Sequence, residues 1–231
     1  MLGQRSDIQM VVFDILGTMV DEPTGIERGI RRLVPDADDT TTRELLNVWQ
    51  WHVEEQQQEI LAGGRPYANS TVVDLEAATE VAAAAGISDE DAVRALAASG
   101  RELDPWPDSV AGLDRIARHF PVVGLSNASP PALTHISARA GLRWHQVLSA
   151  EAAQTYKPHP DVYRLAIANA GCPPDRLLMV AAHAWDLRGA KAVGMRTAYV
   201  ERPVGDPPGP TDSFDLFVAG LDELAASLIP G

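Results

Sequence analysis

Short apolar runs alternate with segments of helical periodicity along much of the chain. Each run is about as long as a β-strand that is covered on both faces. The runs span residues 8–15, 122–125, 147–148, 177–182 and 197–200. Between and after them, apolar residues recur at helical spacing, as in Val110, Leu113, Ile116 and Phe120, in Val162, Leu165, Ala166 and Ala170, and in Leu221, Leu224, Ala225 and Leu228. This alternation predicts an α/β fold whose core is a doubly wound, Rossmann-like parallel sheet with crossover helices.

Residues 21–104 interrupt the alternation, because they show helical periodicity without a convincing strand. Their apolar stripes are Ile26, Ile30 and Leu33, then Leu45, Trp49 and Val53, then Val73, Ala77 and Val81. Ser88 with Asp91 three residues later predicts a capping-box start of a further helix. Pro105 and Pro107 mark the return to the α/β pattern. The sequence therefore predicts a helical cap domain of residues 21–104, inserted into a core formed by residues 1–20 and 105–231.

Composition narrows the possible partners and location. A net charge of −13 over 231 residues disfavours binding to nucleic acid or to an anionic membrane surface. Cys172 is the only cysteine, so no intrachain disulfide forms, which suits a reducing compartment. The sequence contains neither a membrane-spanning apolar run nor a signal-peptide pattern at its start. We therefore predict a cytoplasmic protein without a nucleic-acid or membrane partner.

Polar residues follow four of the predicted strands. They are Asp14, the pair Ser126-Asn127, Lys157, and the segment from His183 to Asp186. Ligands of open parallel sheets bind outside the carboxyl ends of the strands, so these side chains are expected to converge. Ser129 as N-cap with Pro130 at the first helical position predicts a helix start beside Ser126, and a helix N-terminus can bind an anion.

These segments carry a resemblance to a known family. Asp14-Ile15-Leu16-Gly17-Thr18, Ser126-Asn127, Lys157-Pro158 and Trp185-Asp186, in this order, resemble the four motifs of the haloacid dehalogenase superfamily. The similarity is greater to the type II (S)-2-haloacid dehalogenase branch, in which a tyrosine follows the lysine by six residues, as Tyr163 follows Lys157 here. Each motif alone is weak, but four in order at these spacings are specific.

The resemblance implies a metal-independent hydrolase that acts on a small carboxylate and needs no cofactor. Asp14 is expected to attack a carbon by SN2, giving an ester that water hydrolyses. Lys157 is expected to hold Asp14 ionised, since a nearby cation lowers the pKa of a carboxylate. The resemblance implies three further catalytic residues. Asp186 is expected to position Lys157 or water, Thr18 to hydrogen-bond Asp14 or its turn, and Ser126 to receive the substrate carboxylate.

Further residues are expected to contact the substrate. Backbone amides near Ile15 and Leu16 are expected to receive its carboxylate, and Asn127 to contact the leaving group. Trp49 and Trp51 cannot share a helix face, so one is expected to line the site. The other members of the predicted binding set are Gln50, Tyr163, His183 and Trp185.

Two departures from superfamily patterns bear on the reaction. Phosphatases of the superfamily have acids where this chain has Leu16 and Ala181, so the sequence argues against phosphoryl transfer and predicts no metal ligands. The dehalogenases have an arginine beside a tryptophan in the cap, where it holds the halide. Gln50 takes that place if Trp49 matches the tryptophan, and Arg43 or Arg65 could approach instead.

Three hypotheses therefore stay open. The first is dehalogenation of a 2-haloacid, the second is the same Asp14 nucleophile acting on a non-halogenated substrate, and the third is a catalytically silent protein that binds a small acid or a protein partner. A pseudoenzyme has no need for a destabilising buried Asp–Lys–Asp cluster, which favours the enzyme hypotheses. A homodimer is the predicted assembly.

Overall fold

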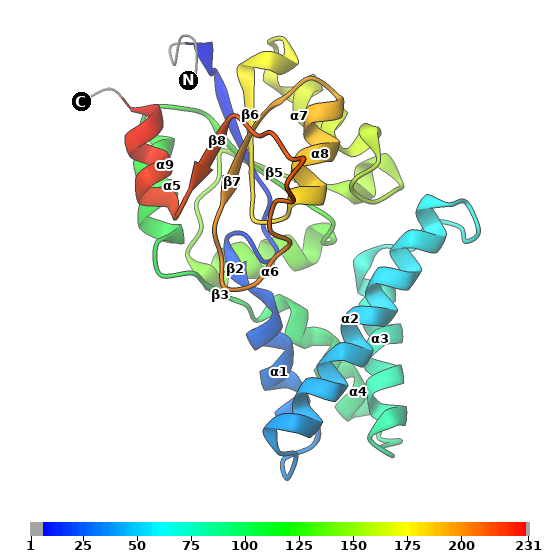
Figure 1. The fold of residues 1–231 in the computed structure, drawn as a ribbon. Helices are drawn as coiled ribbons and strands as arrows, with labels where there is room; N and C mark the ends of the chain where they lie inside the picture. Colours follow the sequence, from blue (N-terminus) through cyan, green and yellow to red (C-terminus); the bar gives the residue numbers. More distant parts are fainter. Residues whose placement is uncertain (1–6, 230–231) are drawn as a thin grey trace.

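The computed structural model describes residues 7–229, and within them a parallel sheet forms the centre of the fold (Figure 1). Its six strands lie in the order β5-β4-β1-β6-β7-β8. Their bounds are Met10–Phe13 for β1, Val122–Ser126 for β4, Gln146–Ser149 for β5, Leu177–Ala181 for β6, Arg196–Val200 for β7 and Leu216–Val218 for β8. Because β1 lies between β4 and β6, the chain winds outward from β1 in both directions.

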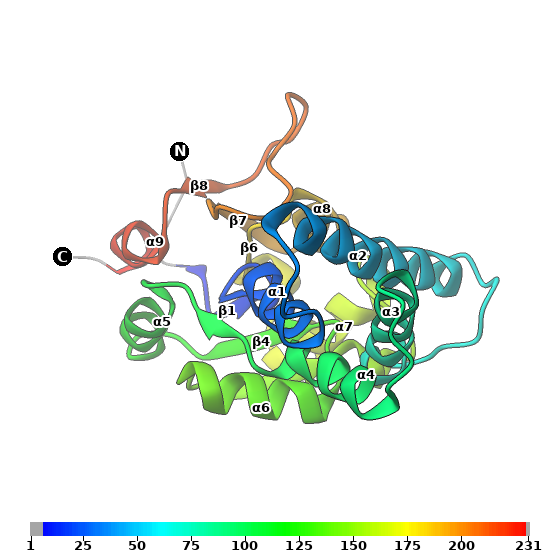
Figure 2. The same ribbon diagram turned by 90° about the horizontal axis from the view of Figure 1, so that it is seen from below.

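Helices cover both faces of this sheet (Figure 2). One face packs against α5 (Ser109–Ala117), α6 (Pro130–Ala140) and α9 (Leu221–Leu228), in a core that includes Val11, Leu113 and Leu224. The other face packs against α7 (Pro160–Ala170) and α8 (Ala184–Ala192), around Val12 and Met179. Strands buried on both sides read as continuous apolar runs, which is why the sequence pattern located them. The predicted doubly wound α/β fold is confirmed.

A group of helices projects from one end of the sheet (Figure 1). It consists of α1 (Glu22–Leu33), α2 (Asp39–Leu61), α3 (Ser70–Ala84) and α4 (Glu90–Ala97). These helices pack around their own apolar cluster, which includes Ile26, Trp49 and Val81. We call this group the cap helices. They contain the apolar stripes expected from the sequence, whereas the division into two domains stays a prediction.

Short strands connect the cap helices to the core. β2 (Val20–Asp21) and β3 (Asp104–Pro105) pair antiparallel, so the two chain crossings lie side by side. The sequence pattern predicted no strand here, because a two-residue strand has no periodicity to detect. The strand β8 was missed for a similar reason. Short 3₁₀ turns at Ala98–Arg101, Ala150–Ala153 and Pro174–Arg176 complete the connections.

Helix caps explain where several elements begin. Asp21, Asp38 and Asn69 each accept a backbone N–H of the first turn of α1, α2 and α3. The expected cap at Ser88 is wrong by one residue, since the Asp89 carboxylate accepts from the amides of Asp91 and Ala92 instead. A carboxylate is a strong N-cap acceptor and prevails over the neighbouring serine. No helix in residues 7–229 is long and apolar enough to cross a membrane.

Candidate active site

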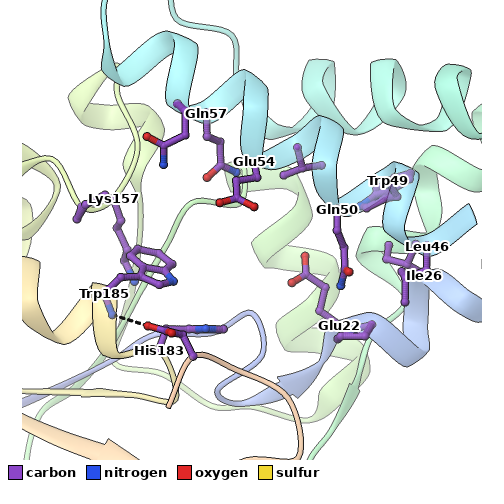
Figure 3. Close-up of a pocket in the computed structure, with 15 residues that line it drawn as sticks. Glu22, Ile26, Leu46, Trp49, Gln50, Glu54, Gln57, Lys157, His183 and Trp185 are labelled. Atoms are coloured by element: carbon purple, nitrogen blue, oxygen red, sulfur yellow. Dashed lines mark hydrogen bonds between the residues drawn. The ribbon is translucent and has the colours of Figure 1, made fainter. Parts of the chain in front are cut away.

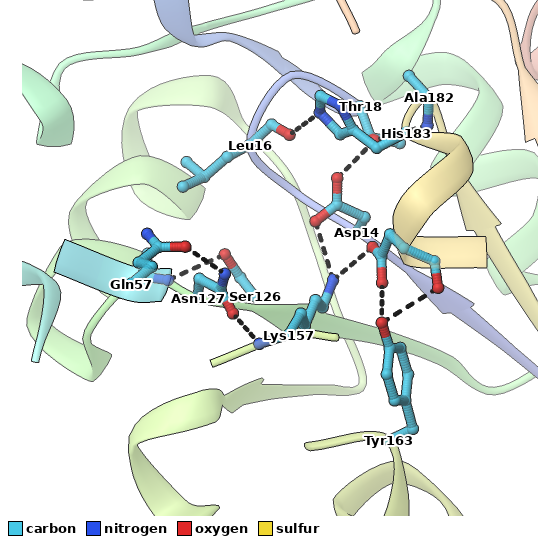
Figure 4. A network of polar contacts seen from close by, with 12 residues as sticks. Asp14, Leu16, Thr18, Gln57, Ser126, Asn127, Lys157, Tyr163, Ala182 and His183 are labelled. Carbon is cyan, nitrogen blue, oxygen red and sulfur yellow. Dashed lines mark hydrogen bonds and ion pairs between the residues drawn. The ribbon is translucent and has the colours of Figure 1, made fainter. Parts of the chain in front are cut away.

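The carboxylate of Asp14 lies directly beyond the end of β1 and is held by two donors (Figure 4). Thr18 Oγ1 donates to Oδ2 at 2.6 Å, and Lys157 Nζ donates to Oδ1 at 3.0 Å. Thr18 Oγ1 in turn accepts the amide of Ala182 at 2.9 Å, which joins the ends of β1 and β6. Asp14 is 6% exposed and its carboxylate is therefore oriented before any ligand binds.

The turn after Asp14 depends on Gly17. Its φ of +74° lies in the left-handed region, where a side chain is strained. A Cβ at this position would also lie 2.7 Å from His183 Nε2, so the His183 side chain would have to shift. His183 Nε2 lies 3.3 Å from the carbonyl oxygen of Leu16. Within the described residues the amides of Ile15 and Leu16 donate no hydrogen bond, so this turn presents two free N–H groups.

Lys157 joins Asp14 to a second buried carboxylate. Its Nζ donates to Asp186 Oδ2 at 2.8 Å, and the Tyr163 hydroxyl donates to Asp186 Oδ1 at 2.7 Å. Burial by itself would lower the pKa of Lys157, but Asp14 and Asp186 together raise it above its usual value. Burial raises the pKa of Tyr163 well above its usual range, so the phenol keeps its proton and stays a donor. The result is an ammonium ion fixed between two carboxylates.

The end of β4 carries Ser126, and Asn127 follows it toward the cap helices (Figure 4). Asn127 Oδ1 accepts the amide of Lys157 at 2.9 Å, and Nδ2 donates to Gln57 Oε1 on α2 at 3.1 Å. Two backbone amides of the expected anion site at the start of α6 already donate to side chains of the protein. The Ala128 amide donates to Ser126 Oγ and the Ser129 amide donates to Ser70 Oγ. Ser129 is the N-cap as predicted.

Two adjoining cavities open between the strand ends and the cap helices. Their volumes are about 640 and 180 Å³ (Figure 3 shows the larger). Asp14, Leu16, Ser126 and Asn127 line the smaller one. The residues that line both are Glu22, Ile26, Trp49, Val53, Gln57, Lys157, His183 and Trp185. The cavities therefore share walls and lead to the Asp14 carboxylate.

Comparison with known proteins places this geometry in a family. A family model for haloacid dehalogenase-like hydrolases matches residues 8–194. The chain belongs to the haloacid dehalogenase-like hydrolases. An (S)-2-haloacid dehalogenase of Xanthobacter autotrophicus is 31% identical over 198 residues, which cover 84% of this chain and 76% of the relative. An (S)-2-haloacid dehalogenase H-109 of Pseudomonas putida is 28% identical over 84% of this chain and 86% of the relative.

Solved structures of haloacid dehalogenases share the whole architecture. A defluorinating L-2-haloacid dehalogenase superposes with a TM-score of 0.87 at 29% identity, covering 96% of this chain and 95% of that one. The L-2-haloacid dehalogenase from Xanthobacter autotrophicus with chloropropionic acid covalently bound gives 0.80 at 26% identity, covering 95% and 97%. Both matches extend through the cap helices.

Some residues of the expected site lie behind the cavity walls in this haloacid dehalogenase-like hydrolase. Three of them, Thr18, Asp186 and Tyr163, are fully buried and line neither cavity. Thr18 contacts Asp14, Asp186 contacts Lys157, and Tyr163 contacts Asp186. Tyr163 was expected to contact substrate, but it lies behind Asp186. The Ile15 side chain is also buried in the core, which leaves its backbone amide as the group that faces outward from the turn.

No arginine of residues 7–229 lines the cavities, although the resemblance implies one on the cap side. Gln50 lines the larger cavity, and Trp49, which is 4% exposed, lines both, whereas Trp51 is 62% exposed and lines neither. Arg65 is paired with Glu76 and Arg43 lines neither cavity, so neither replaces the missing cation. Within residues 7–229, Lys157 is the one Lys or Arg side chain that lines the cavities.

Sequence reasoning missed several polar side chains of the cap helices, among them Gln57, Glu22 and Asp74. These three line the cavities, and no motif marked them. Burial raises the pKa of Glu22 to about 7, with His183 opposing and Asp14 adding to the rise. Burial also raises the pKa of Asp74 to about 8, with Glu22 adding and Arg101 opposing. Within the described residues, no group of three His, Cys, Asp or Glu side chains is arranged to hold a metal ion.

Proposed function

We propose that this protein hydrolyses 2-haloacids through a covalent ester of Asp14. An Asp14 oxygen attacks C2 of the substrate, the C–O bond forms, and the C–halogen bond breaks with its electron pair leaving as halide. Water then adds to the Asp14 carboxyl carbon, and the ester cleaves to a 2-hydroxyacid, a proton and the free carboxylate. The observation that carries this is the Asp14 carboxylate itself, fixed by Thr18 and Lys157 yet open to a cavity.

Substrate orientation comes from the turn after Asp14. The free amides of Ile15 and Leu16, together with the hydroxyl of Ser126, are donors for the substrate carboxylate. Amide donors of a turn form an anion-binding concavity without a side-chain cation. Holding the carboxylate there brings C2 against Asp14, and such positioning supplies a large part of the rate enhancement of displacement reactions.

Hydrolysis of the ester uses the same donors. Negative charge develops on the Asp14 carbonyl oxygen as water adds, and whichever oxygen did not attack keeps its contact with Thr18 or Lys157. Preorganised donors at such an oxygen lower the barrier because they need no reorganisation during the reaction. Asp186 is a positioning residue in this scheme, since it holds Lys157 at 2.8 Å and lines neither cavity.

Halide departure relies on neutral donors in place of the family arginine. One N–H of the Asn127 side-chain amide donates to Gln57. The second N–H of Asn127 and the side-chain NH₂ of Gln57 are then the donors for the leaving group. An amide brings no charge, so bromide and chloride, the better leaving groups, should react faster than fluoride. Gln50 and Trp185 complete this side of the cavity.

Halide release tests the proposal. Wild-type protein should release halide over many turnovers from 2-chloropropionate and 2-bromopropionate, and Asp14→Asn should abolish it. The matched control is Asp36→Asn, an exposed aspartate outside both cavities, which should retain wild-type rates. Lack of release from any chloro-, bromo- or fluoroacid would refute the proposal. A mass adduct on Asp14 from a non-halogenated substrate would then support the second hypothesis.

The boundaries of the two domains and the assembly are part of the same proposal. Residues 21–104 would form a helical cap domain beside a core domain of residues 1–20 and 105–231, and two copies would form a dimer. Sedimentation of the purified protein tests the dimer. The cytoplasmic location stays a prediction.

A further inference from the structure

The cavity in front of Asp14 is lined by an excess of acidic side chains. Glu22 on α1 lines both adjoining cavities, Glu54 on α2 lines the larger one, and Asp74 on α3 lines the smaller one together with Asp14. Asp206 lines the larger cavity as well, but Arg188 lies 4.0 Å from it. Lys157, the Lys or Arg side chain that lines the cavity within residues 7–229, is already bound to Asp14 and Asp186. This excess is unexpected for a site whose substrate is only a small anion.

Glu22 and Asp74 have no partner for their carboxyl groups in the part of the chain that the structure describes. Neither carboxyl forms a hydrogen bond or ion pair there, although both are at the cavity wall (Figure 3 shows Glu22). His183 attracts the Glu22 carboxylate and Arg101 attracts the Asp74 carboxylate, in both cases without a hydrogen bond or ion pair. Both residues are half-buried, and partial removal from water disfavours the charged form of a carboxylate unless a cation lies beside it. Burial raises the pKa of both groups because no adjacent cation offsets the loss of hydration.

Cavity size and aromatic walls add two independent observations. A volume of about 640 Å³ is well beyond what a three-carbon haloacid fills, since pockets of roughly 300–1,000 Å³ hold much larger ligands. Trp49 and Trp185 form part of the wall of both cavities. Tryptophan faces attract cations, and acidic side chains beside them strengthen that attraction. The space beyond C2 therefore suits a long substituent that ends in positive charge.

We propose that the preferred substrate is a 2-haloacid whose C2 substituent ends in a cationic nitrogen, which binds between Glu22 and Asp74. Its carboxylate lies at the amides of Ile15 and Leu16, and its chain crosses the cavity beside Trp49. The proposal rests on the proposed dehalogenase function and names the substrate class of that site. Glu22 and Asp74 are specificity-determining residues here, and the displacement at C2 is unchanged.

The test compares three bromoacids of equal chain length. They are 2-bromo-6-(trimethylammonio)hexanoate, its neutral isostere 2-bromo-7,7-dimethyloctanoate, and 2-bromoheptanedioate. The quaternary nitrogen cannot displace bromide within the same molecule, so all halide above the enzyme-free rate is enzymatic. We expect kcat/KM for the cationic acid to exceed that for its isostere about tenfold, a difference of roughly 1.4 kcal/mol, with the dicarboxylate slowest.

Variants assign the preference to the two acids. Glu22→Gln and Asp74→Asn should each lower the cationic-to-neutral ratio of kcat/KM severalfold, whereas Glu55→Gln, an exposed acid of α2 outside the cavities, should leave the ratio unchanged. The ratio is insensitive to a general loss of active protein. A wild-type ratio near one, or a ratio that neither variant lowers, would overturn the inference while halide release upheld the proposed function. Absence of release from every haloacid would instead refute the proposed function itself.

Discussion

Asp74 lowers the stability of the folded protein at neutral and alkaline pH, and Asp74→Asn should remove this effect. The folded-state pKa is about 8, against an ordinary value of 3.8. The folded protein therefore keeps a proton that the unfolded chain loses. Because the folded-state pKa is raised, the contribution to stability is complete below the ordinary pKa and is lost as the pH rises through the folded-state pKa.

The size of the effect follows from the proton linkage. Stability changes by about 1.36 kcal/mol per pH unit within this window. Between about pH 5.5 and about pH 8, that amounts to at most roughly 3.4 kcal/mol. Water reaches the carboxyl through the open cavity and screens part of its charge, so we expect about 2 kcal/mol. Asparagine has the same shape but does not titrate, so the variant should lack this loss.

Urea unfolding at about pH 5.5 and about pH 8.5 measures the difference. Wild-type protein should lose about 2 kcal/mol more than Asp74→Asn between the two pH values. Glu22 titrates in both proteins, and its repulsion with Asp74 is part of the effect that Asp74→Asn removes. Glu55→Gln should behave as wild type. Equal pH dependence in wild type and Asp74→Asn would refute the reasoning. The variant should also be less selective for cationic substrates, a typical exchange of specificity for stability.

Two further predictions concern the groups behind Asp14. Lys157→Met should abolish halide release and cost about 3–5 kcal/mol of unfolding free energy, because two buried carboxylates lose their ammonium. The folded-state pKa of Lys157 is raised above 10.5, so its contribution to folding stability is complete below that pH and is lost above it. Alkaline titration followed by circular dichroism should therefore show a loss of stability in wild type that the variant lacks. Tyr163→Phe should cost about 1.5–3 kcal/mol, because Asp186 loses a charge-assisted hydrogen bond. Tyr199→Phe is its control, with a change near zero; equal losses in the two variants would show that the contact with Asp186 contributes nothing.

The sequence by itself predicted most strands of the sheet, the polar side chains that follow them, and Asp14 as the candidate nucleophile. Strands covered on both faces must be apolar throughout, so β1, β4, β6 and β7 were visible as runs, and the polar residues at their ends converge because parallel strands share one edge. Asp14 and Ser126 follow from this rule, whereas Lys157 lies beyond the 3₁₀ turn that follows β5. Local chemistry also fixed Ser129 as a helix cap.

Tertiary structure alone decided what surrounds Asp14. Helical periodicity shows which side of a helix is apolar but not which neighbour its polar side faces, so Glu22, Gln57 and Asp74 were not marked by any pattern. They reach Asp14 only because the cap helices return over the strand ends (Figure 1). Tyr163 is the opposite case. Its spacing from Lys157 was visible in the sequence, but only packing against α8 turned it toward Asp186 and away from the cavity.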